Sequence, residues 1–148
     1  MSTPKQPVSV LVVIHTAALD ILLLERAAHP GYWQSVTGSR ESDEPLIETA
    51  RREVFEETGI AAPLAHFSDW QLSNTYEIFP EWRHRYADGV TRNTEHVFSL
   101  ALADRIDITT APEEHRDWLW LPWQTAAERC FSWSNRDAIL MLPKRHAP

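Results

Sequence analysis

The stretch that decides the fold runs from Gly38 to Ile60 and reads GSRESDEPLIETARREVFEETGI. Pro45 near its start and Gly59 near its end follow the usual asymmetry, in which proline opens a helix and glycine comes just after its last turn. Apolar residues recur in between at spacings of three and four, which is typical of a helix with one buried face. These residues are Leu46, Ala50, Val54 and Phe55. The stretch therefore predicts a loop, a helix and a second loop.

The same helix carries an acidic face. Glu53, Glu56 and Glu57 stand at positions i, i+3 and i+4, so their side chains gather on one side. Like charges at these spacings destabilise an isolated helix. Oxygen ligands of this kind suit Mg²⁺ or Mn²⁺. Arg52, four residues before Glu56, is placed to steer its carboxylate. The alternative interpretation is a solvated acidic face that Arg51 and Arg52 stabilise.

The fixed positions of the stretch fit the Nudix signature G-x5-E-x7-R-E-U-x-E-E-x-G-U, where U is aliphatic. They are Gly38, Glu44, Arg52, Glu53, Val54, Glu56, Glu57, Gly59 and Ile60. By this resemblance the chain is identified as a member of the Nudix hydrolase family. The resemblance implies an α/β fold, an α/β/α sandwich with a mixed sheet between helices. It also implies metal-dependent pyrophosphohydrolysis with Mg²⁺, for which Mn²⁺ can substitute. It implies that Glu53 and Glu57 are the principal metal ligands. Glu56 is expected either to be a further ligand or to act as the base on the attacking water.

Length, composition and charge indicate the number of domains, the compartment and the kinds of partner. The chain has 148 residues, which predicts one domain spanning 1–148 with a sizeable core. A single cysteine, Cys130, excludes an internal disulfide framework, and the start MSTPKQP is unlike a signal peptide, so we expect a cytoplasmic protein. The longest apolar run, Val8 to Ile14, is too short to cross a membrane. A formal charge of −7 argues against a nucleic-acid partner. Nothing in the sequence indicates an oligomeric state.

Periodicity and turn residues outline the remaining elements. Strands are expected at Val8–His15, Ile21–Glu25, Ala65–Leu72, Tyr76–Phe79, Glu95–Leu102, Ile106–Thr109 and Trp118–Leu121. Helices are expected at Pro122–Arg129 and Ser134–Leu142. Ser134, with Asp137 three residues on, has the spacing of a helix cap. The segment Pro80–Thr94 is polar, aromatic and basic, and we expect a loop on the substrate side. Strands interrupted by one early and two late helices predict a layered α/β domain.

Four further segments resemble one bacterial Nudix subgroup: PVSVLVVI, YWQSVTGS, RHRYADGVTRNTE and FSWSNRDAI. That subgroup hydrolyses 7,8-dihydroneopterin triphosphate to the monophosphate and pyrophosphate in folate biosynthesis. The entry Ser35-Val36-Thr37-Gly38 also resembles it, where many relatives have a Pro-Gly-Gly-like entry. Two alternatives stay open. One is a general nucleoside triphosphate pyrophosphohydrolase acting on substrates such as dATP. The other is a non-catalytic binding module, which the complete set of signature carboxylates disfavours.

The resemblance also implies roles for residues outside the signature. Glu114, preferred over Glu113, is expected to add a metal ligand or a base from the loop before Trp118–Leu121; the alternative is an exposed acidic turn. The substrate-binding candidates are Lys5, Arg26, Thr37, Tyr76, Glu77, Ile78, Phe79 and Ser132. Arg26 offers a bidentate fork to phosphate. Each candidate has a structural alternative. For Arg26 it is an ion pair with Glu25 or another acid, and for Thr37 it is loop capping. For Lys5 it is a solvated terminus, for Tyr76 to Phe79 sheet packing, and for Ser132 the entry to a helix.

Tyr76 to Phe79 is an aromatic and acidic segment suited to a heterocycle, because rings stack on its aromatic faces and Glu77 can accept from a 2-amino–N–H edge. Of the seven tryptophans, Trp33 is the one expected nearest the pocket. A basic cluster either guides a triphosphate or pairs with nearby carboxylates. Its members are Arg83, His84, Arg85 and Arg92.

Overall fold

The computed structural model describes residues 3–146 and consists of a mixed sheet with helices on both faces. The elements are β1 (Val8–Thr16), β2 (Asp20–Arg26), β3 (Trp33–Gln34), β4 (Val36–Ser39), α1 (Leu46–Thr58), the 3₁₀ turn η1 (Leu64–His66), β5 (Phe67–Glu77), the 3₁₀ segment η2 (Pro80–Arg85), β6 (Arg92–Leu102), β7 (His115–Pro122), α2 (Trp123–Arg129) and α3 (Trp133–His146). Within residues 3–146, no helix is long and apolar enough to cross a membrane.

Strand β1 lies at the centre of the sheet and has different partners along its two edges. One edge pairs in parallel with β6 over its whole length, from Val8 opposite Thr94 to Thr16 opposite Leu102. The other edge pairs antiparallel with β4 over its first half, and with β2 only at His15 opposite Ile21. Strand β2 therefore diverges from β1 where β4 begins, and β2 instead pairs with β7. The predicted mixed sheet is confirmed.

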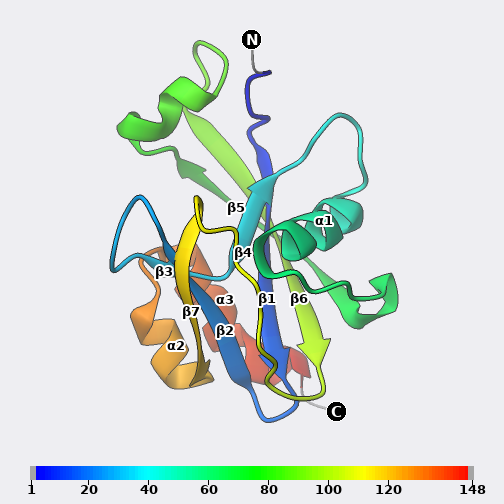
Figure 1. Ribbon diagram of the computed structural model, residues 1–148. Helices are drawn as coiled ribbons and strands as arrows, with labels where there is room; N and C mark the ends of the chain where they lie inside the picture. The colour runs from blue at the N-terminus through cyan, green and yellow to red at the C-terminus, as the bar shows by residue number, and fades with distance from the viewer. Residues whose placement is uncertain (1–2, 147–148) are drawn as a thin grey trace.

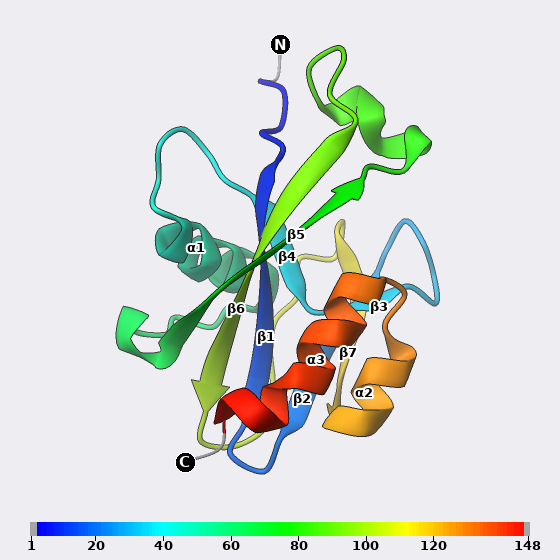
Figure 2. The ribbon, with the colours of Figure 1, turned by 180° about the vertical axis from the view of Figure 1, so that it is seen from behind.

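The helices form the outer layers. Helix α1 covers one face, and α2 and α3 cover the other (Figures 1 and 2). Successive residues of a strand point to opposite faces, so β1 supplies both cores. Val10, Val12 and Ile14 belong to the cluster that contains Ala50 and Val54 of α1. Leu11 and Val13 belong to the second cluster, which contains the buried residues of α2 and α3. The predicted α/β/α sandwich is confirmed.

Three strand predictions were wrong in detail. The segments Ala65–Leu72 and Tyr76–Phe79 overlap one long strand, β5, whose pairing with β6 shifts between Asp69 and Ser73, while residues 65–66 lie in η1 and residues 78–79 follow the strand. Gln71 has a positive φ of 52° at this irregularity, so the alternation breaks there although the strand continues. The segment 106–109 forms no strand. Its Thr109 amide donates to the Thr58 carbonyl at the end of α1, 3.0 Å away, and Ile108 packs against the core cluster that contains Ala50 and Val54 of α1.

The helix boundaries follow local chemistry. Helix α1 starts after Pro45 and ends at Gly59, whose φ of 77° is the left-handed conformation that glycine adopts without strain. This confirms the predicted bounds. The prediction that Ser134 caps α3 was wrong: the helix begins at Trp133, and the Ser132 hydroxyl accepts the Asn135 amide at 3.3 Å. Ser134 is buried inside the first turn.

Candidate active site

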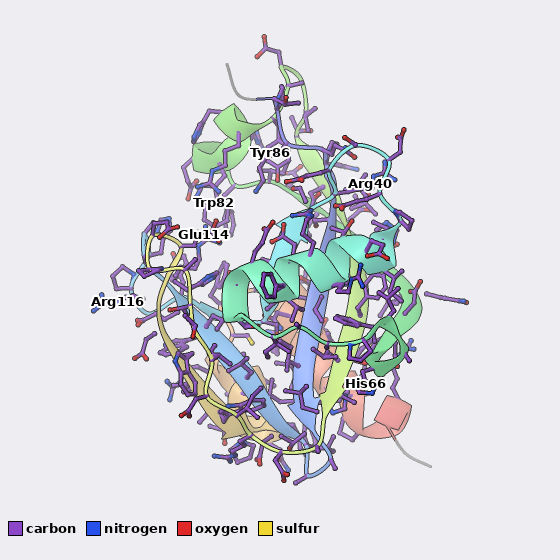
Figure 3. The ribbon with its side chains drawn as sticks, turned by 45° about the vertical axis from the view of Figure 1, so that its right-hand side comes forward. Arg40, His66, Trp82, Tyr86, Glu114 and Arg116 are labelled. Carbon is purple, nitrogen blue, oxygen red and sulfur yellow. The ribbon has the colours of Figure 1, made fainter. Side chains whose placement is uncertain are left out.

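A cleft of about 1060 Å³ opens between the N-terminal segment, the β4–α1 loop, η2, the loop before β7 and the start of α3. The structure brings nearly all sequence-predicted site residues to this one cleft. Those lining it are Lys5, Arg26, Thr37, Glu53, Glu56, Glu57, Tyr76, Glu77, Ile78, Phe79, Glu114 and Ser132. Arg52 does not line it and lies behind the carboxylates. Figure 3 shows Trp82 and Tyr86 on the η2 side of this region and Glu114 on the loop before β7.

Gly38 sets the distance between β4 and α1. A Cβ atom at this position would overlap the carboxylate of Glu53, which lies directly against the glycine. The signature glycine is therefore required for close approach and not for an unusual backbone angle, since its φ is not among the positive values. The absence of a side chain at position 38 lets the Glu53 carboxylate reach the floor of the cleft.

Arg52 holds the carboxylates behind the cleft in place. Its guanidinium contacts Glu44 at 2.7 Å, Glu53 at 2.9 Å and Glu56 at 3.3 Å, and it donates to the backbone carbonyl of Ser39 at 3.0 Å. The hydrogen bond from Arg52 lowers the pKa of Glu44 to about 2. Arg52 and Glu44 thus tie the loop after β4 to the helix, and Arg52 orients Glu53 and Glu56 without entering the cleft.

Glu57 is the most deeply buried carboxylate of the site. Only 2% of the residue is exposed, and its Oε1 atom has no hydrogen-bond partner. Burial raises its pKa well above the ordinary value, and the hydrogen bond with Glu53 and the charges of Glu53 and Glu114 raise it further. Burial likewise raises the pKa of Glu53, against the lowering effect of Arg52. An isolated buried charge is costly, so this pair is stable in ionised form only beside a cation.

His115 lies against this pair from β7. Its Nε2 atom is 3.7 Å from Glu57 Oε1 and 3.5 Å from the Gln34 amide nitrogen. Burial, followed by the positive charge of Arg26, lowers the pKa of His115 to about 4. The imidazole is therefore neutral at pH 7, and its contact with Glu57 is not an ion pair under those conditions. Sequence reasoning did not select this residue, and only the register of β2 and β7 places it here.

Glu114 faces Glu57 from the opposite wall. Its carbonyl accepts the Ala27 amide at 2.9 Å, just beyond the point where Arg26 of β2 pairs with His115 of β7. Among residues 3–146, no three acidic, histidine or cysteine side chains stand close enough to enclose a metal ion without rearrangement. The Glu53–Glu57 pair is assembled, whereas Glu114 contributes its charge from across the cleft. Glu113 lines the cleft as well.

Cations line the same cleft as the acidic helix. The Arg26 guanidinium donates to the Gln34 side-chain oxygen at 3.3 Å and lies 4.7 Å from the centre of the Trp82 ring. Lys5 is joined to Arg85 through a backbone hydrogen bond of 2.8 Å, and both line the cleft. Burial and the charge of Arg85 lower the pKa of Lys5. A cleft lined by both carboxylates and cations suits a polyanion that arrives with a metal ion.

The aromatic lining differs from the expectation. Trp33 was expected nearest the pocket, but it is buried in the core between the sheet and α2–α3, with Arg129 over its ring. Trp82 and Trp133 line the cleft instead. Of the predicted basic cluster, only Arg85 lines it. The local sequence did not show which tryptophans line the cleft, because that depends on which face of a strand or turn points toward it.

A scan against protein-family models matches residues 5–142 to the NUDIX domain. The chain belongs to the Nudix family. Two relatives match nearly all of it. The dihydroneopterin triphosphate diphosphatase of Escherichia coli (strain K12) is 46% identical over 138 residues, 91% of each chain. The Haemophilus influenzae protein of the same name is 38% identical over 134 residues, 88% of this chain and 84% of the relative.

Solved structures of the Nudix family give the same fold. The structure of the E. coli dihydroneopterin triphosphate pyrophosphohydrolase superposes with a TM-score of 0.88 at 43% identity, covering 97% of this chain and 99% of that one. A Nudix hydrolase from Listeria monocytogenes superposes with a TM-score of 0.78 at 23% identity and shares the fold. The resemblance inferred from the signature is confirmed, and the chain is a hydrolase of a family that depends on divalent metals.

Proposed function

We propose that the chain is a cytoplasmic, single-domain enzyme that hydrolyses 7,8-dihydroneopterin triphosphate to dihydroneopterin monophosphate and pyrophosphate, with Mg²⁺ as its metal and Mn²⁺ as a substitute. One observation carries the proposal. A single cleft is lined by the signature carboxylates, by cations, and by polar and aromatic side chains. The two relatives named for this activity, each similar over most of both chains, support the choice of substrate.

The acidic pair fits a divalent cation. Glu57 keeps a buried oxygen without a partner, and Glu53 and Glu57 both have raised pKa values, so a cation would relieve two unfavourable features at once. Glu53 and Glu57 would hold it, with Glu114 added from the facing loop. When bound, the cation supplies charge neutralisation to the triphosphate and to its transition state.

The remaining residues bind, orient and accept a proton. Arg26 and Lys5 bind phosphate oxygens. Thr37, on β4, donates a hydrogen bond to another substrate or phosphate oxygen. A water molecule attacks the α- or the β-phosphorus, the bond from that phosphorus to the oxygen that bridges the two breaks, and the monophosphate and pyrophosphate separate. Glu56 takes the proton from this water. It is the signature carboxylate that lines the cleft without belonging to the buried pair, and 52% of its side chain is exposed to solvent.

A competition assay tests the proposal. Dihydroneopterin triphosphate, dATP and GTP are compared by kcat/KM with and without Mg²⁺. The three share one triphosphate, so preference must come from the heterocycle and its linker. We expect the pterin substrate to be preferred by roughly ten- to several-hundredfold, the effect of one or two hydrogen bonds. Equal or better efficiency on dATP would favour a nucleotide-sanitising enzyme. Absence of pyrophosphate release from every substrate would indicate a binding module.

A further inference from the structure

The far end of the cleft contains two buried polar residues that the mechanism does not use. Asn93 and Glu95 stand two apart on β6, so they face the same side of the sheet, and both line the cleft. We call them the β6 polar pair. Only 2% of Asn93 and 4% of Glu95 is exposed. Buried amides and carboxylates are uncommon in a strand unless their polar atoms have partners.

The neighbours of the β6 polar pair satisfy only part of it. The Asn93 amide nitrogen donates to the Ser9 hydroxyl at 2.7 Å and to the Tyr76 hydroxyl at 3.0 Å. The Tyr76 hydroxyl donates to Glu95 Oε2 at 3.4 Å, and the Ser134 hydroxyl also hydrogen-bonds Glu95. Two acceptors remain without a partner, Asn93 Oδ1 and Glu95 Oε1.

Both atoms without a partner are hydrogen-bond acceptors, so only a hydrogen-bond donor can satisfy them. Leaving a buried acceptor unsatisfied is costly, more so for a charged one, so a ligand with donors gains from meeting them. Because Asn93 uses both its donor contacts on Ser9 and Tyr76, its carbonyl is the free end of the amide. A ligand that presents two N–H donors can satisfy both atoms.

We propose that the β6 polar pair recognises the amino and ring N–H edge of a 2-amino-4-oxo heterocycle, the edge that pterin and guanine share. The inference rests on the proposed function and names the residues that select its substrate. It differs from the expectation that Glu77 has this role. Glu77 lines the cleft but is exposed, and because it follows Tyr76 in β5 its side chain points to the opposite face of the sheet from that of Tyr76.

The pair would discriminate against adenine. Adenine presents an unprotonated ring nitrogen where guanine and pterin present a ring N–H, so a carboxylate oxygen would face an acceptor. Sites built to bond a substrate N–H reject analogues that lack it much more strongly than apolar pockets reject a missing methylene. The β6 polar pair thus predicts that pterin and guanine triphosphates both rank above adenine triphosphates, while the preference for pterin over guanine comes from the rest of the heterocycle and its linker.

The test is the variant Glu95→Gln, compared with wild type by kcat/KM on dihydroneopterin triphosphate, dGTP and dATP at saturating Mg²⁺. The two nucleotides differ only in the base. We expect the dGTP-to-dATP ratio and the pterin-to-dATP ratio each to fall by about 10- to 100-fold, the effect of losing a charge-assisted hydrogen bond. The matched control is Glu81→Gln on η2, an exposed residue outside the cleft, which should keep both ratios.

Two outcomes would overturn the inference: ratios that stay unchanged in Glu95→Gln, whether or not activity falls equally on all three substrates, or a shift of the ratios by Glu77→Gln and not by Glu95→Gln. If Glu95→Gln does not fold by circular dichroism, Asn93→Leu is tested on the same ratios. The nucleotide ratio separates this inference from the proposed function. A wild-type enzyme that prefers dGTP to dATP through Glu95 but hydrolyses the pterin substrate poorly would disprove the proposed function alone.

Discussion

At the scale of single residues, the signature separates two tasks. Arg52 and Glu44 hold the site together from behind, since their shortest contact is 2.7 Å and Arg52 does not line the cleft. Glu53 and Glu57 supply the oxygens in the cleft. Glu57 is the more extreme of the two, because it is almost completely buried and keeps an unpartnered oxygen. Burial raises its pKa, so a bound cation would favour its ionised form.

Glu57→Gln should therefore lower kcat by at least about a hundredfold, or about 2.7 kcal/mol, while the fold stays intact. The amide keeps the shape of the carboxylate but removes a charged ligand. The measurement is pyrophosphate release at saturating Mg²⁺, with circular dichroism to check folding. The matched control is Glu48→Gln on the same helix, whose side chain makes a surface ion pair with Arg51 and should be neutral. Near-normal kcat in Glu57→Gln would remove Glu57 from the metal ligands.

At the scale of elements, the site depends on how closely β4 approaches α1. Helix α1 is positioned by its apolar side, through Ala50 and Val54 in the core. Its acidic side then meets the edge of β4, where Gly38 leaves room for the Glu53 carboxylate. The packing of one face of the helix thus determines the location of Glu53 and Glu57, the proposed metal ligands, on the other.

Gly38→Ala tests this arrangement. Its methyl group would occupy the space of the Glu53 carboxylate, so Glu53 must move or the helix must shift away from β4. We expect kcat to fall by about a hundredfold and the Mg²⁺ concentration for half-maximal activity to rise, because a misplaced ligand weakens metal binding. The measurement is a Mg²⁺ titration of activity, with the melting temperature as a check on folding. An unchanged titration would show that the close approach is not needed.

At the scale of the whole molecule, charge is distributed unevenly. The chain carries a formal charge of −7, yet Lys5, Arg26 and Arg85 all line the cleft. The acidic pair on α1 lines the same cleft. Burial raises the pKa of Glu57, so the folded protein without metal retains a proton that the unfolded chain loses. Metal binding and folding are therefore linked through pH.

This linkage gives a pH prediction for the protein in EDTA. Below about pH 4.5, the ordinary value for Glu57, both states hold the proton and the residue costs no stability. Above it, the unfolded chain releases the proton first, so wild type becomes less stable relative to Glu57→Gln as pH rises. His115 acts in the opposite direction between its pKa of about 4 and its ordinary 6.5, but it is present in both proteins and largely cancels.

The measurement is urea unfolding of both proteins in EDTA at several pH values from 4 to 8. The difference in free energy of unfolding should grow with pH in favour of Glu57→Gln. Saturating Mg²⁺ at neutral pH should reverse its sign, since only the wild-type site binds metal tightly. A difference that is constant with pH would mean that burial does not perturb Glu57.

The sequence by itself determined the features that depend on neighbours a few residues away. The signature fixes the bounds of α1, the common face of Glu53, Glu56 and Glu57, and the family. Helical spacing depends only on local backbone geometry, so these features needed no partner segment. The same reasoning failed for the α3 cap, where Ser132 and Ser134 both offered plausible hydroxyls and packing selected Ser132.

Only the tertiary structure decided which distant segments meet. Glu114 and His115 reach the acidic pair through the register of β2 with β7, and Glu95 enters the cleft because β6 lies beside β1. Trp82, and not Trp33, lies over Arg26, because η2 folds back across the cleft. A strand has two faces, and a shift of one residue in register exchanges them. Residues that act through pairing between strands are therefore determined by long-range packing, which the local pattern does not contain.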